Sequence, residues 1–396
     1  MSDLLNKIYT GSTTQPGNPK RQKLIKPLPA VSPARLFAVE GAEKAQLPQP
    51  LIKTLDDLKR NLQTAVELEH STIPPYLCAL YSIKEGTNTV ASTIIRSVVV
   101  EEMLHMILAA NILNAIGGKP VINQKEFVPT YPGYLPGSDK SFIVGLEKFS
   151  KESIDVFLKI EKPSPPLPKF DPEQAADLLF EDPGFQTIGQ FYQAIMLGIE
   201  YVNENTPGGI FIDDPEVHKR QVTQEHYYGS GGMIVPVYSI ENAREAIEEI
   251  VGQGEGIDDT IDDSDAKLFG QTTEYAHYFR FNELLMERMY AEDDTPKSGP
   301  TGDPIVVDWI AVHNMKANPK VEDYKDQPDL LTKAKEFNQS YTQLLDQIHK
   351  ACNGEPEQLM KGIALMYKLK YLATELMNIP LGDSGMMAGP TFEYEP

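Results

Sequence analysis

Residues 100–105 read VEEMLH and place Glu102 three positions before His105. In a helix this spacing puts both side chains on one face, about one turn apart, so they can share one ion. Apolar residues of the same stretch recur at alternating spacings of three and four, which predicts a buried row with Glu101 beside it. That row is Ile95, Val98, Glu102, His105, Ala109, Ile112 and Ile116. An ionisable pair among aliphatic side chains needs a partner.

The preceding stretch, residues 51–81, has the same helical periodicity. Its inward row contains Glu69, whereas Glu67 falls on roughly the opposite face. Glu69 precedes Glu102 by 33 residues, and two antiparallel helices joined by a short loop bring residues at that separation level with one another. Pro74 and Pro75 lie one helical turn after Glu69, and they predict a kink in this helix. We therefore expect Glu69 to face Glu102 and His105.

A later predicted helix, residues 267–290, repeats the Glu-x-x-His spacing at Glu274 and His277. Carboxylate-bridged di-iron bundles use one glutamate from each of two helices and one Glu-x-x-His pair from each of the other two. Carboxylate oxygens bridge the ions and a histidine nitrogen binds each at its end. Two such pairs and the lone Glu69 supply three of the four parts of this pattern.

The fourth part is expected near a further predicted helix, residues 239–251. Glu255 lies just after it in the sequence QGEG, where an antiparallel neighbour would bring it close to His277. Glu200 is an alternative, and Glu248 is a third. The candidate metal ligands are therefore Glu69, Glu102, His105, Glu255, Glu274 and His277.

The pattern of apolar residues predicts a mostly all-α chain built around a four-helix bundle. Residues 1–50 are rich in Pro, Lys, Gln and Ala without apolar periodicity, which predicts an extended N-terminal arm. We expect residues 51–396 to form a metal-binding domain. It carries an inserted excursion at about 120–240, interrupted by prolines and glycines, and an extra helical pair at about 330–380.

The composition excludes several classes of partner. The 36 Lys and Arg against 57 Asp and Glu give a net charge of −21, which argues against nucleic acid or an anionic membrane as a partner. Two cysteines are too few for a disulfide framework, and there is no run of about 18 uncharged apolar residues that would span a membrane. These features predict a cytoplasmic protein.

Four segments resemble the ferritin-like domain of the iminophenylpyruvate dimer synthase family, which couples two indole-pyruvate imines in violacein and rebeccamycin biosynthesis. They are ELEHSTIPPYLCALYSI (67–83), EEMLH (101–105), QGEG (253–256) and HYFRF (277–281), and the similarity runs from about residue 51 to GPTFEY at 389–394. The resemblance implies a ferritin-like core with iron at Glu69, Glu102, His105 and His277. It favours Glu255 over Glu200, while Glu274 rests on spacing.

Together these observations predict a non-haem iron oxidase or oxygenase of secondary metabolism, with a small organic molecule and O2 as its partners. The iron site is mononuclear or dinuclear, manganese is a possible replacement, and a homo-oligomer is possible. The rival from a different class is a ferritin-like metal-storage or interaction protein without turnover of an organic substrate. The third interpretation is a buried polar network without metal. Such a network is energetically unfavourable because its charged groups lose their hydration.

Overall fold

The computed structural model describes residues 52–164, 184–227, 231–257 and 259–396, so the expected arm at 1–50 lies outside the described residues. The fold is helical, as expected, and the described part of the chain contains isolated β-bridges but no strand. The longer helices are α2 (Leu55–Ser82), α3 (Thr89–Ala115), α4 (Lys151–Ile160), α6 (Ile188–Glu204), α8 (Ile240–Glu255), α10 (His277–Met286), α11 (Pro328–Cys352) and α12 (Gln358–Leu376). Single turns are α7 (Pro215–His218), α9 (Asp265–Phe269), η2 (Lys125–Phe127), η3 (Gln224–His226) and η4 (Val321–Tyr324).

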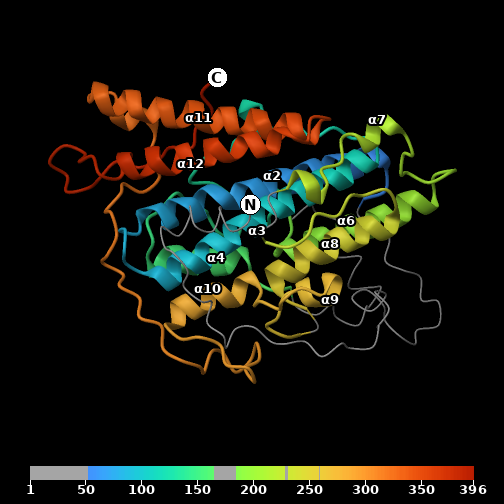
Figure 1. Ribbon diagram of the computed structural model, residues 1–396, viewed down its shortest axis with the longest axis horizontal. Coiled ribbons are helices and arrows are strands. Elements are labelled where there is room, and N and C mark those ends of the chain that lie inside the picture. Colours follow the sequence, from blue (N-terminus) through green and yellow to red (C-terminus); the bar gives the residue numbers. More distant parts are fainter. Residues whose placement is uncertain (1–51, 165–183, 228–230, 258) are drawn as a thin grey trace.

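Four helices form a closed ring in which α2 contacts α3, α3 contacts α8, α8 contacts α6, and α6 contacts α2. The short helices α4 and α10 pack against each other, and α10 also contacts α3 and α8 (Figure 1). The segment 120–240, expected as an excursion, supplies α6 to this ring. This part of the segment therefore belongs to the bundle itself.

Helix α3 is the central helix of the bundle. By length and composition it could cross a membrane, but 89% of its most apolar window is buried inside the protein. Its neighbours α2, α8 and α10 cover it with apolar side chains. We therefore interpret α3 as a core helix, whose apolar character serves packing.

The C-terminal helical pair, α11 and α12, has the predicted extent and lies along one side of the molecule beside α2 and α3 (Figure 1). The two helices pack against each other, α11 also contacts α3, and α12 also contacts α2. The pair thus covers the outer surface of the α2–α3 hairpin, on the side away from α10.

The prediction of a single helix at 267–290 is wrong, because the structure has two short helices there, α9 and α10. Gly270 ends α9 with a positive φ of 66°, a conformation that a glycine adopts without strain. Residues 271–276 are not helical, and Tyr275 pairs with Asp262 in an isolated bridge. Glu274 is consequently not on the helix that begins at His277.

Helix α2 continues past Pro74 and Pro75 to Ser82, although each proline lacks the N–H that a helix uses. Pro75 leaves the carbonyl of Ser71 without its usual partner four residues later. The buried hydroxyl of Tyr131 donates a hydrogen bond of 2.7 Å to that carbonyl. A side chain outside the bundle thus replaces the missing backbone donor.

We expect Tyr131→Phe to lower the free energy of unfolding by about 1–3 kcal/mol, because the buried Ser71 carbonyl then has no donor. Urea denaturation followed by circular dichroism measures this change. The control is Tyr371→Phe on α12, whose side chain is 73% exposed and whose hydroxyl is free to bind water. Equal stability changes in the two variants would contradict the role assigned to Tyr131.

Candidate metal centre

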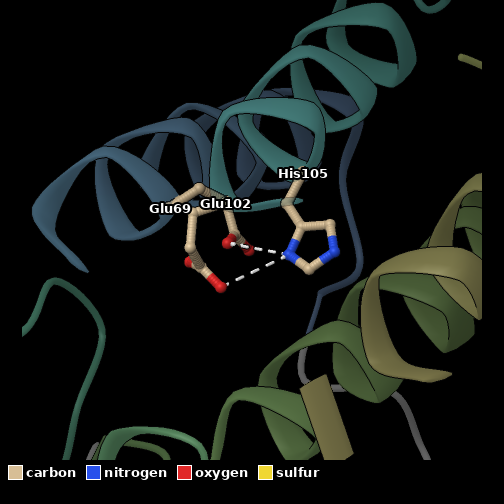
Figure 2. Close-up of side chains that lie close together, drawn as sticks. All are labelled: Glu69, Glu102 and His105. Atoms are coloured by element: carbon tan, nitrogen blue, oxygen red, sulfur yellow. Dashed lines mark ion pairs between the residues drawn. The ribbon is translucent and has the colours of Figure 1, made fainter. Parts of the chain in front are cut away.

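The first donor group joins α2 to α3. Glu69 on α2 and Glu102 and His105 on α3 point toward one another inside the ring (Figure 2). The Nδ1 atom of His105 lies 3.7 Å from Oε2 of Glu69 and 3.7 Å from Oε1 of Glu102. All three side chains are buried. The facing predicted from the 33-residue separation is confirmed.

The second donor group contains Glu102 again, together with Glu161 and His277. The Nδ1 atom of His277 lies 3.0 Å from Oε1 of Glu102 and 3.4 Å from Oε2 of Glu161. Glu161 follows α4 directly, and His277 is the first residue of α10. Because Glu102 belongs to both groups, the two form one continuous cluster of three carboxylates and two imidazoles.

Each imidazole is held from behind through its other ring nitrogen. The Nε2 atom of His105 is 2.9 Å from Oε1 of Gln253, and Nε2 of His277 is 2.8 Å from Oε2 of Glu101. These acceptors favour a proton on Nε2, which leaves the Nδ1 lone pairs facing the carboxylates. Metal-binding histidines have this arrangement, with the outer nitrogen donating to a carboxylate or carbonyl.

Glu101 lies inside the protein, although its position beside the inward row predicted a less buried side chain. Arg280 on α10 donates to both of its oxygens, at 2.8 Å each. Burial by itself raises the pKa of Glu101, but Arg280 and His277 lower it to about 2. Glu101 is therefore a permanently charged acceptor behind His277.

Hydroxyl groups fix the outer oxygens of the three clustered carboxylates. Each donor is a buried side chain of α2 or α6, so the ring of helices sets the orientation of the carboxylates. A carboxylate that accepts a hydrogen bond on one oxygen keeps the other available to a ligand. The donor and acceptor pairs are Tyr192 with Glu69, Tyr76 with Glu161, and Thr72 with Glu102, the last at 2.7 Å.

The electrostatics of the cluster favour a cation. Burial, together with the charges of Glu161 and Glu69, raises the pKa of Glu102 to about 7. Burial lowers the pKa of His277, but the carboxylates of Glu161, Glu101 and Glu102 outweigh it and raise that pKa well above its usual value. Crowded carboxylates that attract protons in this way also attract a metal ion.

The geometry at His277 passes a more specific test of fit. Within the described part of the chain its Nδ1 atom makes no hydrogen bond, although two carboxylates lie within 3.4 Å. A buried nitrogen without a hydrogen bond calls for an explanation, and a coordinated cation supplies one. Oxygen and imidazole donors suit iron and manganese. The residues present therefore fit a transition-metal centre.

The structure brings together four of the six predicted ligands, and Glu255 and Glu274 lie elsewhere. Glu255 accepts hydrogen bonds from the backbone N–H groups of Ser164 and Gly189, at 2.8 and 2.7 Å. It thereby caps the beginning of α6. The part of QGEG that reaches the cluster is Gln253, two residues earlier.

The prediction of Glu274 as a metal ligand is corrected. Glu274 precedes α10, so the spacing of one helical turn does not place its side chain beside that of His277. Its side chain is 59% exposed and lies 3.5 Å from Arg280. Of the two alternatives, Glu200 pairs with Arg244 at 2.7 Å, and Glu248 belongs to neither donor group.

Glu161 is the member of the cluster that was missed from the sequence. A signal was present, because Ile154, Phe157 and Leu158 form a buried apolar row on α4 and Glu161 continues their spacing by one turn. Its side chain is buried, as that row predicts. An acidic residue that continues an apolar row is the same signal that identified Glu69 and Glu102.

The comparisons with known proteins agree with this geometry. A family model described as ferritin-like matches residues 62–286. Dichlorochromopyrrolate synthase of Lentzea aerocolonigenes is 24% identical over 403 residues, which cover 87% of this chain and 36% of the synthase. The chain thus spans about a third of the length of that relative.

Among solved structures, a ferritin-like protein from Caulobacter vibrioides matches with a TM-score of 0.56 and 21% identity. The match covers 87% of this chain and all of the other, and it supports the fold. The resemblance noted in the sequence is confirmed by these matches. Since the family model covers more than half of the chain, the protein belongs to the ferritin-like family.

Proposed function

We propose that the chain is a non-haem di-iron oxidoreductase that uses O2 to oxidise a small organic molecule. The observation that carries this proposal is the pair of donor groups that share Glu102, with an imidazole on each side. A shared carboxylate between two nitrogen donors is the arrangement with which bundle proteins hold two ions. A mononuclear centre would use only one of the two donor groups.

Five side chains are proposed as ligands. Glu69 and His105 would hold one ion, Glu161 and His277 the other, and Glu102 would lie between them. Iron bound there would supply the one-electron changes that reaction with O2 requires. Manganese suits the same donors and remains the alternative metal. The free, buried Cys78 and Cys352 fit the reducing cytoplasm that we propose as its location.

For the reaction we propose an oxidative coupling of two imines derived from an aromatic amino acid. The support is the similarity to a synthase of secondary metabolism over 87% of this chain. In such a coupling two C–H bonds are lost and one C–C bond forms. The two electrons and two protons released reduce one O2 to H2O2, so the reaction balances with O2 as the oxidant.

Metal analysis of the purified wild-type protein tests this proposal. We expect about two irons per chain after anaerobic loading with Fe(II) and removal of loosely bound metal, since the two donor groups predict two ions. One iron per chain would favour a mononuclear oxygenase, and no retained iron, manganese or zinc would contradict the proposal.

A second measurement separates an oxidase from a storage protein. The iron-loaded protein is mixed with indole-3-pyruvate and ammonium, which form an imine in solution, and O2 uptake and products are followed. Coupled product formed in step with repeated O2 uptake supports the proposal. O2 uptake that stops after the iron is oxidised, without an organic product, would favour storage.

A further inference from the structure

The two imidazoles of the cluster face matched sets of carboxylates. The Nδ1 atom of His105 lies beside Glu69 and Glu102. The Nδ1 atom of His277 lies beside Glu161 and, again, Glu102. Each proposed metal position thus has one imidazole, one glutamate of its own and one shared glutamate. Because the ligand types are the same, the main chemical difference between the positions lies in the groups behind the imidazoles.

A charged carboxylate lies behind His277. The Oε2 atom of Glu101 is 2.8 Å from Nε2 of His277, and both oxygens of Glu101 accept hydrogen bonds of 2.8 Å from the guanidinium of Arg280. A bidentate pair with an arginine, which is always charged, holds the carboxylate ionised. Glu101 is 4% exposed, so solvent screens its charge from the imidazole only weakly.

The positive charge of Arg280 does not cancel this negative charge, because Arg280 also faces two other carboxyl groups. Asp263 lies 3.7 Å from Nη2 of Arg280, and Glu274 lies 3.5 Å from Nη1. Burial raises the pKa of Asp263 to about 8, whereas Glu274 is 59% exposed and ionised at pH 7. One cation thus faces the two charged carboxylates of Glu101 and Glu274, and the group presents net negative charge to His277.

A neutral amide lies behind His105. Its oxygen, Oε1 of Gln253, is 2.9 Å from Nε2 of His105. The amide has this orientation because its nitrogen faces three acceptors on the other side, and a reversed amide would turn its oxygen toward them. These acceptors are Oδ1 of Asp265 at 2.7 Å, Oε1 of Glu249 at 3.0 Å and the carbonyl of Gly231 at 3.3 Å.

The acidic groups next to this amide do not contact His105 directly. Burial and the charge of Asp265 raise the pKa of Glu249 to about 10, so Glu249 is a neutral acid at pH 7. Asp265 lies beyond the amide, and Gln253 separates its charge from the imidazole. The hydrogen bond of His105 therefore ends on a neutral oxygen, whereas that of His277 ends on an anion.

We propose that the two metal positions are unequal, and that the ion beside Glu161 and His277 is bound more tightly than the ion beside Glu69 and His105. This inference rests on the proposed di-iron function. An imidazole that donates to a carboxylate is a more basic metal ligand than one that donates to an amide oxygen. The charge of Glu101 also stabilises the ferric over the ferrous state, so the iron beside His277 has the lower reduction potential.

Two single variants isolate the two positions. Glu69→Ala keeps the position beside His277. Glu161→Ala keeps the position beside His105. Metal-free, full-length protein is titrated anaerobically with Fe(II) in competition with a chelator of known affinity. Fe(II) should bind to Glu69→Ala about 10–100-fold more tightly than to Glu161→Ala, and the iron in Glu69→Ala should have the lower reduction potential. Equal affinities, or the reverse order, overturn the inference.

Glu101→Gln in the Glu69→Ala background tests whether the charge behind His277 is the cause. Glutamine keeps the shape of the side chain, so the Fe(II) affinity should fall about 10–100-fold and the reduction potential should rise. The matched control in the same background is Glu248→Gln, because Glu248 is a buried glutamate of α8 that belongs to neither donor group. This control should leave the affinity and the potential unchanged.

The outcomes separate this inference from the proposed function. An unchanged affinity and potential in the Glu101→Gln variant overturn the role assigned to Glu101, and the two single variants decide the inference if that double variant does not fold. Wild-type protein that binds two irons, together with equal affinities in the two single variants, contradicts only the inequality. Wild-type protein that binds no iron contradicts the proposed function itself.

Discussion

Glu102→Ala is expected to remove nearly all tightly bound iron, because Glu102 belongs to both donor groups. Loss of a group that merely orients a ligand typically lowers metal affinity by about 10–100-fold, and loss of a shared ligand should exceed this. The measurement is iron per chain by plasma mass spectrometry after dialysis against a weak chelator. Retention of about two irons per chain in this variant would contradict the proposed centre.

Glu67→Ala is the matched control, because Glu67 is a half-buried glutamate of α2 whose carboxylate accepts a hydrogen bond from Gln63. It should keep the iron content of the wild type. A measurement of metal-free protein guards against unfolding as the cause of iron loss in Glu102→Ala. Removing one of three crowded carboxylates relieves repulsion, so the melting temperature of that variant without metal should not fall below that of the metal-free wild type.

Glu161→Ala and Glu274→Ala are expected to differ sharply in the iron that they retain. Both residues are glutamates near His277, Glu161 in space and Glu274 in sequence. Glu161 lies 3.4 Å from Nδ1 of His277, so its removal should release the iron on that side and leave about one per chain. Glu274 is exposed and pairs with Arg280, so its removal should leave both irons.

The readout for this pair is again iron per chain, with electron paramagnetic resonance of the one-electron-reduced protein to report whether the two ions are coupled. The coupled signal should disappear in Glu161→Ala and persist in Glu274→Ala. The reverse result would restore Glu274 as the ligand that the Glu-x-x-His spacing predicts.

The sequence identified Glu69, Glu102 and His105 because all three lie within long, uninterrupted helices. In such helices the spacing of apolar residues determines which side chains face inward. The number of residues between two positions determines whether they lie at the same height along the bundle. The same reasoning gave the C-terminal helical pair, since Gly354 and Pro356 separate two long periodic stretches.

The sequence misplaced Glu274 because Gly270 interrupts the pattern and the next helix begins only at His277. Periodicity over a short stretch does not reveal such a break. Glu255 was misplaced for another reason. A partly buried glutamate near a cluster of acids can be a ligand or a helix cap, and only the position of α6 decides between them.

The five proposed ligands are spread over 209 residues of sequence, from Glu69 to His277. During synthesis the first donor group can form once α2 and α3 have paired, whereas the second waits for α10, more than 160 residues later. Bringing such distant segments together carries a large loop-closure entropy, which slows folding. Iron bound across both groups would hold the early hairpin and the late helix together, so that metal uptake completes the folding of the bundle and delays its unfolding.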